Sequence, residues 1–352
     1  MTEKLPIEFG LDTFGDVGSD DAGNPISAAQ SIRDIVDQAI LADELGIDHF
    51  NIGEHHRDDF AVSAPDTVLA GIATVTHNIT LGSGVTVLSS EDPVRVYQRF
   101  ATLDALSNGR AEITAGRGSF TESFPLFGFA LSDYEQLFEE RLDLLVELLK
   151  ERPVTWSGQT RAALVNQEVY PKTESGSIPL RVGVGGSPHS VIRAAKHGAT
   201  LALAIIGGSP DRFAPFVGLY RESLKRFDKP QLSVGIHSPG HISETDEQAA
   251  KEMWPQYNKS FGRIGQERGW GPMTYDHFDN EVQHGSLYVG SPETVAKKII
   301  FALESTGANR FELKYSTGAM PQSQMLKSIK LYATEVIPMV KAALGTEVSI
   351  TY

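Results

Sequence analysis

Four titratable residues, Glu54, His55, His56 and Arg57, follow one another directly after the segment HFNIG. A carboxylate beside imidazoles can carry general acid–base chemistry, because histidine changes its charge near neutral pH. The same residues could also ligate a metal ion, form a wall of a cofactor site, or belong to an ordinary surface. Neighbouring residues of a strand point to opposite faces. We therefore expect only one of the two histidines to enter a site, and we expect His56 to be structural.

The segment GVGGSP at 183–188 has the composition of an anion site. The free N–H groups and the dipole at a helix N-terminus attract negative charge. Gly185 and Gly186 would let a ligand approach the backbone closely, and Ser187 and Ser190 would add hydroxyl groups. The same pattern is typical of a tight turn between a strand and a helix, so both interpretations stay open here.

Arg117 stands between two glycines at the end of the apolar segment 111–116. An arginine at the end of a buried strand needs an anionic partner, because a buried unpaired charge is very costly. That partner is either a carboxylate, such as Glu54, Glu112 or Glu122, or the phosphate of a bound ligand.

The sequence does not favour a metal site. Barrel hydrolases that bind metals usually carry two histidines on the first strand, where this chain offers only Asp12. His237 and His241 are four residues apart, but Pro239 and Gly240 between them prevent a helix from aligning the two rings. Without a ligand spacing typical of zinc, we predict that the protein binds no metal.

The composition narrows the class of partner. The chain has 352 residues, a formal net charge of −14 and no cysteine. This charge argues against nucleic acid and anionic membranes as partners. The absence of cysteine excludes disulfides and a cysteine nucleophile and is typical of the cytoplasm. No signal-type segment opens the chain, and no run reaches the ~20 apolar residues of a membrane span, so we predict a cytoplasmic protein.

Short apolar segments alternate with helix-period segments along the whole chain. We predict strands at 7–14, 49–55, 79–88, 111–118, 181–186, 200–206, 232–242 and 310–315. Eight buried strands, each followed by a helix, predict one (β/α)8 TIM barrel over residues 1–352. The alternative is a doubly wound open sheet, whose G-x-G-x-x-G fingerprint is missing after the first segment.

Two segments interrupt this alternation. Residues 151–180 contain turn signals and short β-like pieces, which suggest an insertion before strand 5 that could form a hairpin. Residues 266–288 are Gly-rich, and we predict an irregular insertion between strands 7 and 8. Because strands 4 and 5 are neighbours in a barrel, Arg117 and the turn at Ser187 could hold one phosphate at the carboxyl ends of the strands.

Glycines also occur inside the third predicted strand, at Gly82 and Gly84. Glycine weakens a strand and often marks a bulge or the close approach of a ligand. The alternative interpretation is that these glycines make packing space for a neighbouring helix.

Several motifs together resemble the bacterial luciferase-like family of flavin-dependent monooxygenases. They are EHH at 54–56, LGSGVTVLSSEDPVR, LSNGRAEITAGRG, GVGGSP and YVGSPETVAKKI. The resemblance covers roughly residues 6–125 and 180–340, and the motifs occur in the family's order. It implies a TIM barrel that binds FMN or coenzyme F420 at its C-terminal mouth, usually as a dimer.

The resemblance also implies roles for individual residues. Gly84 and Val85 would be joined by a cis peptide bond against which the flavin ring lies. His55 would be the catalytic histidine, and Glu54 would orient it. The remaining cofactor-binding residues would hold the phosphate: Arg117, Gly185, Gly186, Ser187 and Ser190.

Two positions depart from the family pattern. The luciferases carry a cysteine where this chain has Gly116, and an acid where it has Gly186. Light emission is therefore not expected, whereas flavin binding is unaffected.

The predicted function is that of a two-component monooxygenase. Reduced FMN would be a co-substrate supplied by a separate flavin reductase, and a homodimer would use it with O2 to oxygenate a small organic substrate. Phe120, Phe124 and Phe127 would line the substrate side or simply pack in the core. One alternative is an F420-dependent hydride-transfer enzyme, although its acidic cofactor would find few cations beyond Arg57, Arg95 and Arg117. A non-catalytic flavin-binding protein and a metal hydrolase are further interpretations that the sequence leaves open.

Overall fold

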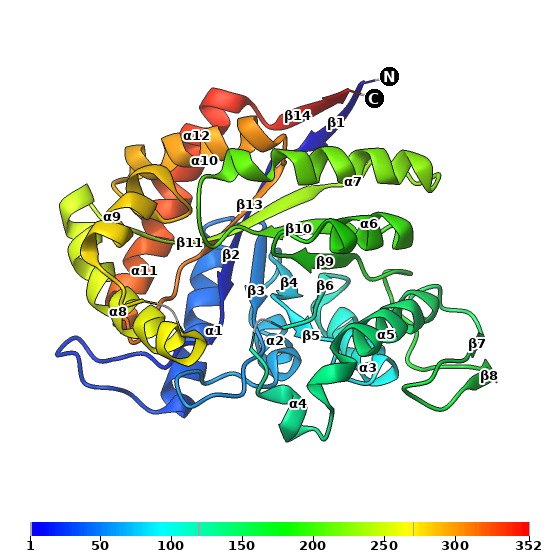
Figure 1. The fold of residues 1–352 in the computed structure, drawn as a ribbon. Helices are drawn as coiled ribbons and strands as arrows, with labels where there is room; N and C mark the ends of the chain where they lie inside the picture. Colours follow the sequence, from blue (N-terminus) through cyan, green and yellow to red (C-terminus); the bar gives the residue numbers. More distant parts are fainter. Residues whose placement is uncertain (1, 119, 270, 352) are drawn as a thin grey trace.

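The computed structural model describes residues 2–118, 120–269 and 271–351. Eight parallel strands form a closed barrel in chain order (Figure 1). They are β2 (Glu8–Thr13), β3 (His49–Ile52), β4 (Thr80–Ser83), β6 (Ala111–Gly116), β9 (Leu180–Val184), β10 (Thr200–Ala204), β11 (Val234–Ile242) and β13 (Arg310–Lys314). Because β13 pairs with both β11 and β2, the sheet has no open edge. The prediction of a TIM barrel is confirmed, and the open sheet is wrong.

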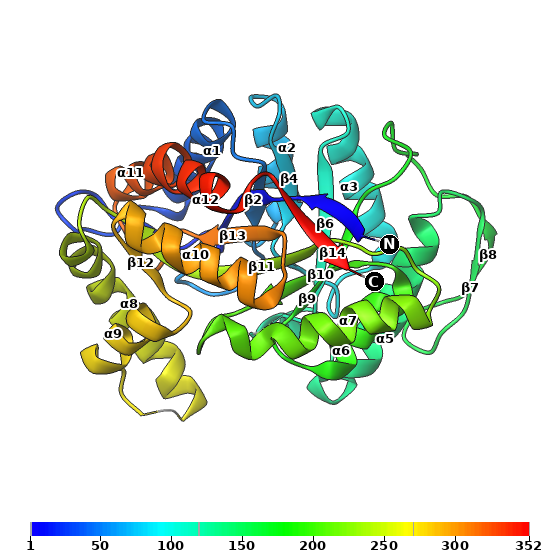
Figure 2. The same ribbon diagram turned by 90° about the horizontal axis from the view of Figure 1, so that it is seen from above.

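Helices surround the barrel on its outside (Figure 2). They are α1 (Ala28–Glu44), α2 (Pro65–Ala73), α3 (Pro93–Ser107), α5 (Tyr134–Leu148), α6 (Pro188–His197), α7 (Ala214–Arg226) and α10 (Pro292–Thr306), with α11 (Gln322–Leu331) continuing through a π-helical turn into α12 (Ile337–Leu344). Side chains of Ser27, Asp92 and Ser291 accept N–H groups at the starts of three of these helices, which satisfies donors that a helix leaves free. Among the described residues, no helix is long and apolar enough to cross a membrane.

The two insertions differ in how well the sequence anticipated them. Residues 151–180 contain the antiparallel hairpin of β7 (Val154–Trp156) and β8 (Leu164–Gln167), as expected. Residues 266–288 are not irregular, because α8 (Asp246–Arg268) enters this segment and α9 (Tyr275–His284) and β12 (Tyr288–Gly290) follow.

Helix α9 forms because its apolar side chains find a partner in α8. Phe278 and Val282 pack with Met253 and Tyr257 in a small core of their own. The hydroxyl of Thr274 accepts the N–H of residue 277 and caps the helix. The prediction of an irregular segment is wrong. The glycines before this helix suggested a loop, and the helix has only a short apolar pattern, Phe278 and Val282.

The sequence analysis also missed a pair of strands at the ends of the chain. Strand β1 (Thr2–Pro6) pairs antiparallel with β14 (Glu347–Thr351). Figure 1 shows this pair at one end of the barrel, where both termini lie. The carboxyl ends of the barrel strands lie at the other end.

The interior of the barrel contains a buried ionic cluster. Glu112 accepts hydrogen bonds of 2.9 and 2.8 Å from Arg310, and Glu312 accepts 2.7 and 2.6 Å bonds from Arg181. Burial would raise the pKa of Glu112, but the two guanidinium groups outweigh it and hold the pKa at about 2. Each charge is therefore paired, as a buried charge must be. Glu112 is not available to Arg117.

Candidate active site at the barrel mouth

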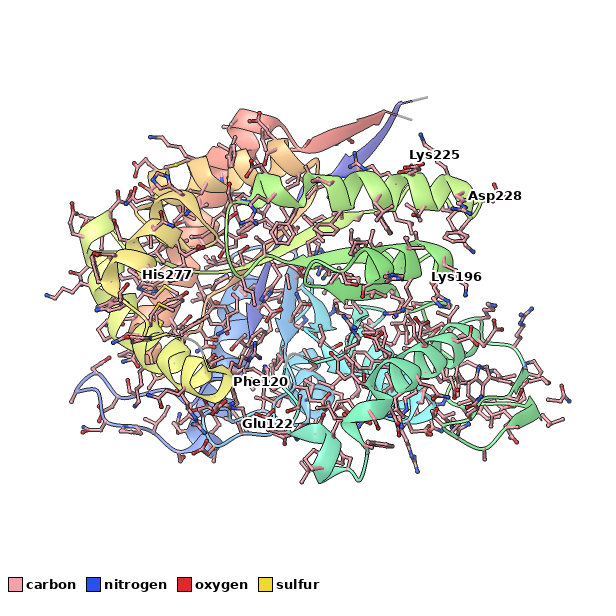
Figure 3. The ribbon with its side chains drawn as sticks, in the orientation of Figure 1. Phe120, Glu122, Lys196, Lys225, Asp228 and His277 are labelled. Atoms are coloured by element: carbon pink, nitrogen blue, oxygen red, sulfur yellow. The ribbon has the colours of Figure 1, made fainter. Side chains whose placement is uncertain are left out.

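A cavity of about 310 Å³ lies at the carboxyl ends of the barrel strands. Every barrel strand, or the loop that follows it, contributes a lining residue, including Asp12, Glu54, Gly84, Thr114, Gly185, Ala204, His237 and Glu312. Figure 3 shows Phe120 and Glu122, which also line the cavity, at the end of the barrel remote from the chain termini. In a TIM barrel this is the end that carries the chemistry.

The loop after β4 contributes to the floor of this cavity. The peptide bond between Gly84 and Val85 is cis, as the family resemblance led us to expect. The Val85 side chain packs over Gly116, where an added Cβ atom would come within 2.5 Å of it. An added Cβ atom at Gly84 would collide with Asp12, and one at Gly82 with Asn51. The strand glycines therefore make room for polar side chains of the barrel interior, not for a helix.

His55 lies among aromatic rings. Its ring centroid is 4.8 Å from that of Phe14, 4.3 Å from that of Phe60 and 5.1 Å from that of Phe120. This burial lowers the pKa of His55 to about 3. The imidazole is therefore neutral at physiological pH, and the expectation that it titrates near neutrality is wrong.

Glu54 contacts the other histidine of the motif. Its Oε1 atom is 2.9 Å from His56 Nε2, and its Oε2 atom accepts the N–H of Val87 at 2.9 Å. Both residues lie in the loop after β3, which ends at Ile52. The expectation that Glu54 orients His55 is not met. Glu54 instead holds the loop after β4 through the N–H of Val87. His55 and His56 both line the cavity, so the expectation that only one of them enters the site is wrong.

Arg117 lines the cavity and pairs with a carboxylate that the sequence analysis did not consider. Its guanidinium forms an ion pair with Glu135 at the start of α5 and lies 5.3 Å from the ring centroid of Tyr134. The other Glu135 oxygen is 3.3 Å from Nη2 of Arg193. Arg193 in turn reaches Ser190 Oγ at 3.5 Å. A single carboxylate thus lies between Arg117 and the first turn of α6.

The turn before α6 is open. Gly186 has a φ of +117°, a conformation that favours glycine. Added Cβ atoms at Gly185 and Gly186 would meet nothing within 4 Å. Ser187 begins the helix, but its side chain makes no capping hydrogen bond. Of this turn, Gly185 lines the cavity, whereas Gly186, Ser187 and Ser190 are not among the lining residues.

Several polar lining residues escaped the sequence analysis. In the described part of the chain, Asp12 Oδ1, Asn51 Oδ1 and Thr114 Oγ1 are buried and have no hydrogen-bond partner. His237 and Asp12 were considered only as strand-end residues or metal ligands, but their side chains meet at 3.3 Å in the cavity. The alternation of side chains along the strands could have placed Asp12 and His237 inside the barrel. The contact between them could not be predicted, because it depends on the closure of the barrel.

The entrance carries ion pairs between the loop after β3 and the end of α8. Arg57 Nη1 is 2.6 Å from Glu267 and 3.2 Å from Glu122, and Arg57 Nε is 2.9 Å from Asp59. The Arg57 guanidinium also lies 4.8 Å from the ring centroid of Phe120. The charge of Arg57 is therefore balanced by neighbouring carboxylates. Over residues 2–118, 120–269 and 271–351, no three His, Asp or Glu side chains form a group that could hold a metal ion.

Comparison with known proteins agrees with this architecture. A family model described as luciferase-like monooxygenase matches residues 7–310. The chain belongs to this family. As a luciferase-like monooxygenase, it is an oxidoreductase.

Three proteins illustrate what this luciferase-like monooxygenase is similar to. The oxygenase component of a flavin-dependent trigonelline monooxygenase from Acinetobacter baylyi is 25% identical over 89% of this chain and 92% of its own. The oxygenating constituent of 3,6-diketocamphane monooxygenase from Pseudomonas putida, solved with FMN, has a TM-score of 0.78 at 19% identity, over 95% of this chain and 98% of its own. The coenzyme F420-dependent tetrahydromethanopterin reductase from Methanopyrus kandleri has a TM-score of 0.74 at 20% identity, over 96% and 100%. The two solved structures share the fold.

Proposed function

We propose that this enzyme binds reduced FMN at the barrel mouth and uses it with O2 to oxygenate a small, largely apolar organic substrate. A separate flavin reductase would supply the reduced FMN. The observation that carries the proposal is one cavity that combines an apolar floor, unpartnered polar groups and Arg117 at its edge. The similarity to a flavin-dependent oxygenase component supports the same function.

The residues of the cavity suit a flavin ring. Val85 and Gly116 offer a flat apolar surface on which the ring would lie. The unpartnered atoms of Asn51 and Thr114 would bind polar atoms of the ring edge, since buried polar groups without partners are costly. When bound, reduced FMN supplies the electrons that activate O2.

The phosphate of FMN would lie between Arg117 and the turn of Gly185, Gly186, Ser187 and Ser190. The Glu135 carboxylate now lies between Arg117 and Arg193. We propose that the phosphate replaces this carboxylate, because both are anions and Glu135 is a partly exposed side chain that can turn towards solvent.

We propose that His55 acts as a neutral imidazole. With Phe14, Phe60 and Phe120 it would exclude water from the reacting atoms. His55→Ala should leave FMN affinity nearly unchanged and lower turnover, and a fully active variant would remove His55 from the mechanism. Glu54 would act indirectly, because it accepts the N–H of Val87 and so holds the loop after β4.

The F420-dependent alternative finds less support. F420 carries an acidic tail that needs free cations at the mouth. Arg57 is already paired with three carboxylates, and Arg95 donates to Gln98 on the surface of α3. The cavity is lined by Glu54, His55 and Arg117. These residues argue against a flavin-binding protein without activity.

The deciding experiment is an anaerobic titration with reduced FMN, followed by exposure to air. We expect saturable binding and then consumption of O2 that depends on the bound flavin. Tight binding of F420 together with no binding of reduced FMN would reverse the assignment.

We also propose that the protein forms a homodimer in the cytoplasm. Val75, which follows α2, and Leu106, near the end of the neighbouring helix α3, are each 45% exposed, and such apolar side chains suit an interface. Sedimentation of the purified protein would give its mass, and a monomer would contradict the proposal.

A further inference from the structure

Besides His55 and His56, a third histidine lines the cavity next to a buried carboxylate, and the proposed function has used neither this histidine nor its carboxylate. His237 belongs to β11 and Asp12 to β2, the two strands that flank β13. His237 Nδ1 is 3.3 Å from Asp12 Oδ2, and both residues line the cavity. The pair thus reaches the space in which a substrate would be bound.

The surroundings hold this pair in place. Asp12 is 3% exposed, and its Oδ1 atom has no partner in the described part of the chain. The His237 ring lies nearly parallel to that of Phe14, with the centroids 5.6 Å apart and an angle of 11° between the planes. Because Nδ1 faces the carboxylate, Nε2 on the other side of the ring is directed away from it. A carboxylate at one nitrogen selects the tautomer and leaves the other nitrogen for a ligand.

The other charged groups near the pair have partners or are screened from it. Those that face it are Glu312 and Lys314 of β13, and His55 behind the ring of Phe14, while β10 presents Ala204 beside His237. Glu312 is bound by the arginines of the barrel interior, and Lys314 pairs with Asp16. Of the described carboxylates, Asp12 is the one in contact with His237.

The three histidines that line the cavity, His55, His56 and His237, differ in their surroundings. His55 is enclosed by phenyl rings, which lower its pKa to about 3. Burial raises the pKa of Asp12, although the nearby imidazole of His237 counteracts part of this effect. A proton that reaches the cavity finds only apolar rings around His55, whereas His56 and His237 each face a carboxylate. Both oxygen atoms of Glu54 beside His56 already have partners, but Oδ1 of Asp12 beside His237 has none in the described part of the chain.

We propose that His237, positioned by Asp12, is the group of this cavity that exchanges a proton with the bound molecule. The proton would move between His237 Nε2 and an oxygen atom of that molecule, and the pair itself would transfer no electrons. The substrate class is then an apolar molecule that carries a carbonyl or hydroxyl oxygen. This inference rests on the proposed function, since it concerns the same cavity.

The first test uses the protein without flavin. The pH titration of the imidazole rings is followed by nitrogen-15 NMR in the unmodified protein, His237→Gln and Asp12→Asn, and the signal absent from His237→Gln identifies His237. In Asp12→Asn we expect the nitrogen-15 shifts of the two ring nitrogens of His237 to change, because the carboxylate that faces Nδ1 and selects the tautomer is lost. Unchanged shifts would overturn the inference.

The second test follows the reoxidation of bound reduced FMN by O2 as a function of pH. We expect the pH dependence to be lost in His237→Gln and kept in His55→Gln. His241→Gln is the matched control, since His241 lies on the same strand but pairs with Glu252 outside the cavity; it should keep the pH dependence. The inference is wrong if the pH dependence persists in His237→Gln and vanishes in His55→Gln.

The two tests separate this inference from the proposed function. If the unmodified protein does not bind reduced FMN, the proposed function fails, and the NMR titration still decides the role of Asp12. If reduced FMN binds and the nitrogen-15 shifts of His237 do not respond to Asp12→Asn, the proton assignment fails and the proposed function stands.

Discussion

Individual side chains of the mouth take their roles from the partners that the fold gives them. Glu54, His55 and His56 are neighbours in the sequence, but the first and third are hydrogen-bonded to each other, whereas His55 lies among aromatic rings. The outcome is one histidine hydrogen-bonded to a carboxylate and one in an apolar cage. Two adjacent histidines thus have different surroundings.

The first prediction concerns the anion site. Arg117→Ala should weaken FMN binding by more than about 1.4 kcal/mol, or about tenfold, because it removes the guanidinium from the phosphate. Glu135→Gln should instead strengthen binding, since it removes the carboxylate that competes for Arg117. Fluorescence titration of FMN measures both effects.

Glu147→Gln is the matched control for Glu135, because Glu147 lies on the same helix and pairs only with surface cations. It should leave FMN affinity unchanged. If Arg117→Ala binds FMN as tightly as the unmodified protein, the phosphate site has been assigned wrongly.

The second prediction concerns acid stability. The pKa of His55 is about 3 in the folded protein and about 6.5 in the unfolded chain. The unfolded chain therefore binds more protons between these values, and the free energy of unfolding falls as the pH drops from about 6.5 towards 3. His55→Phe should remove this contribution, on the order of 4 kcal/mol.

Urea unfolding at a series of pH values measures this difference. His277→Gln serves as the control, because His277 is exposed on α9 (Figure 3) and should leave the pH profile unchanged. An equal loss of stability in acid for His55→Phe and the unmodified protein would contradict the burial argument.

At the scale of elements, the entrance is defined by two segments far apart in the sequence. The loop after β3 and the last turns of α8 are joined by Arg57 with Glu267 and by Arg263 with Asp58. The hydrogen bond to Arg57 lowers the pKa of Glu267 below its usual range, so this carboxylate stays charged at neutral pH. The end of α8 is thus held over the mouth mainly by charge.

The third prediction follows from this arrangement. Glu267→Gln should loosen the end of α8 and speed the release of bound FMN, because it removes one half of a double hydrogen bond to Arg57. Hydrogen exchange of residues 262–268 and stopped-flow dissociation measure the two effects. Glu247→Gln, at the exposed opposite end of α8, should change neither. Unchanged exchange in Glu267→Gln would show that apolar packing holds this helix end.

At the scale of the whole molecule, the interior charges link distant strands. Glu112, Arg181, Arg310 and Glu312 come from three strands and are nearly inaccessible to water. Removing one partner of such a group leaves an unpaired buried charge. The cluster therefore affects the stability of the entire barrel.

The fourth prediction tests this cluster. Glu112→Gln should lower the free energy of unfolding by about 3–5 kcal/mol, as measured by urea unfolding at neutral pH. Glu244→Gln, which breaks an exposed pair with Lys327, should cost less than about 1 kcal/mol. Equal effects of the two changes would mean that the interior charges are solvated.

Local patterns were enough to predict the eight strands, because each is a short apolar segment between helix-period segments. The cis bond at Gly84 was anticipated only through family motifs, whereas the place of Arg117 at the carboxyl end of its strand followed from the strand pattern. Contacts such as Arg117 with Glu135 and His237 with Asp12 were missed, since they join a strand to a later helix or to a distant strand. Periodicity carries no information about such pairs.

The pairing of β1 with β14 has a practical consequence. The first and last described residues, Thr2 and Thr351, are partners in this pair, and both lie at the end of the barrel opposite the cavity. A short peptide could therefore join the two ends, and new ends could be opened at the tip of the β7–β8 hairpin. Such a circularly permuted chain should keep its cavity intact, and an affinity tag attached next to Thr2 or Thr351 should leave the entrance clear.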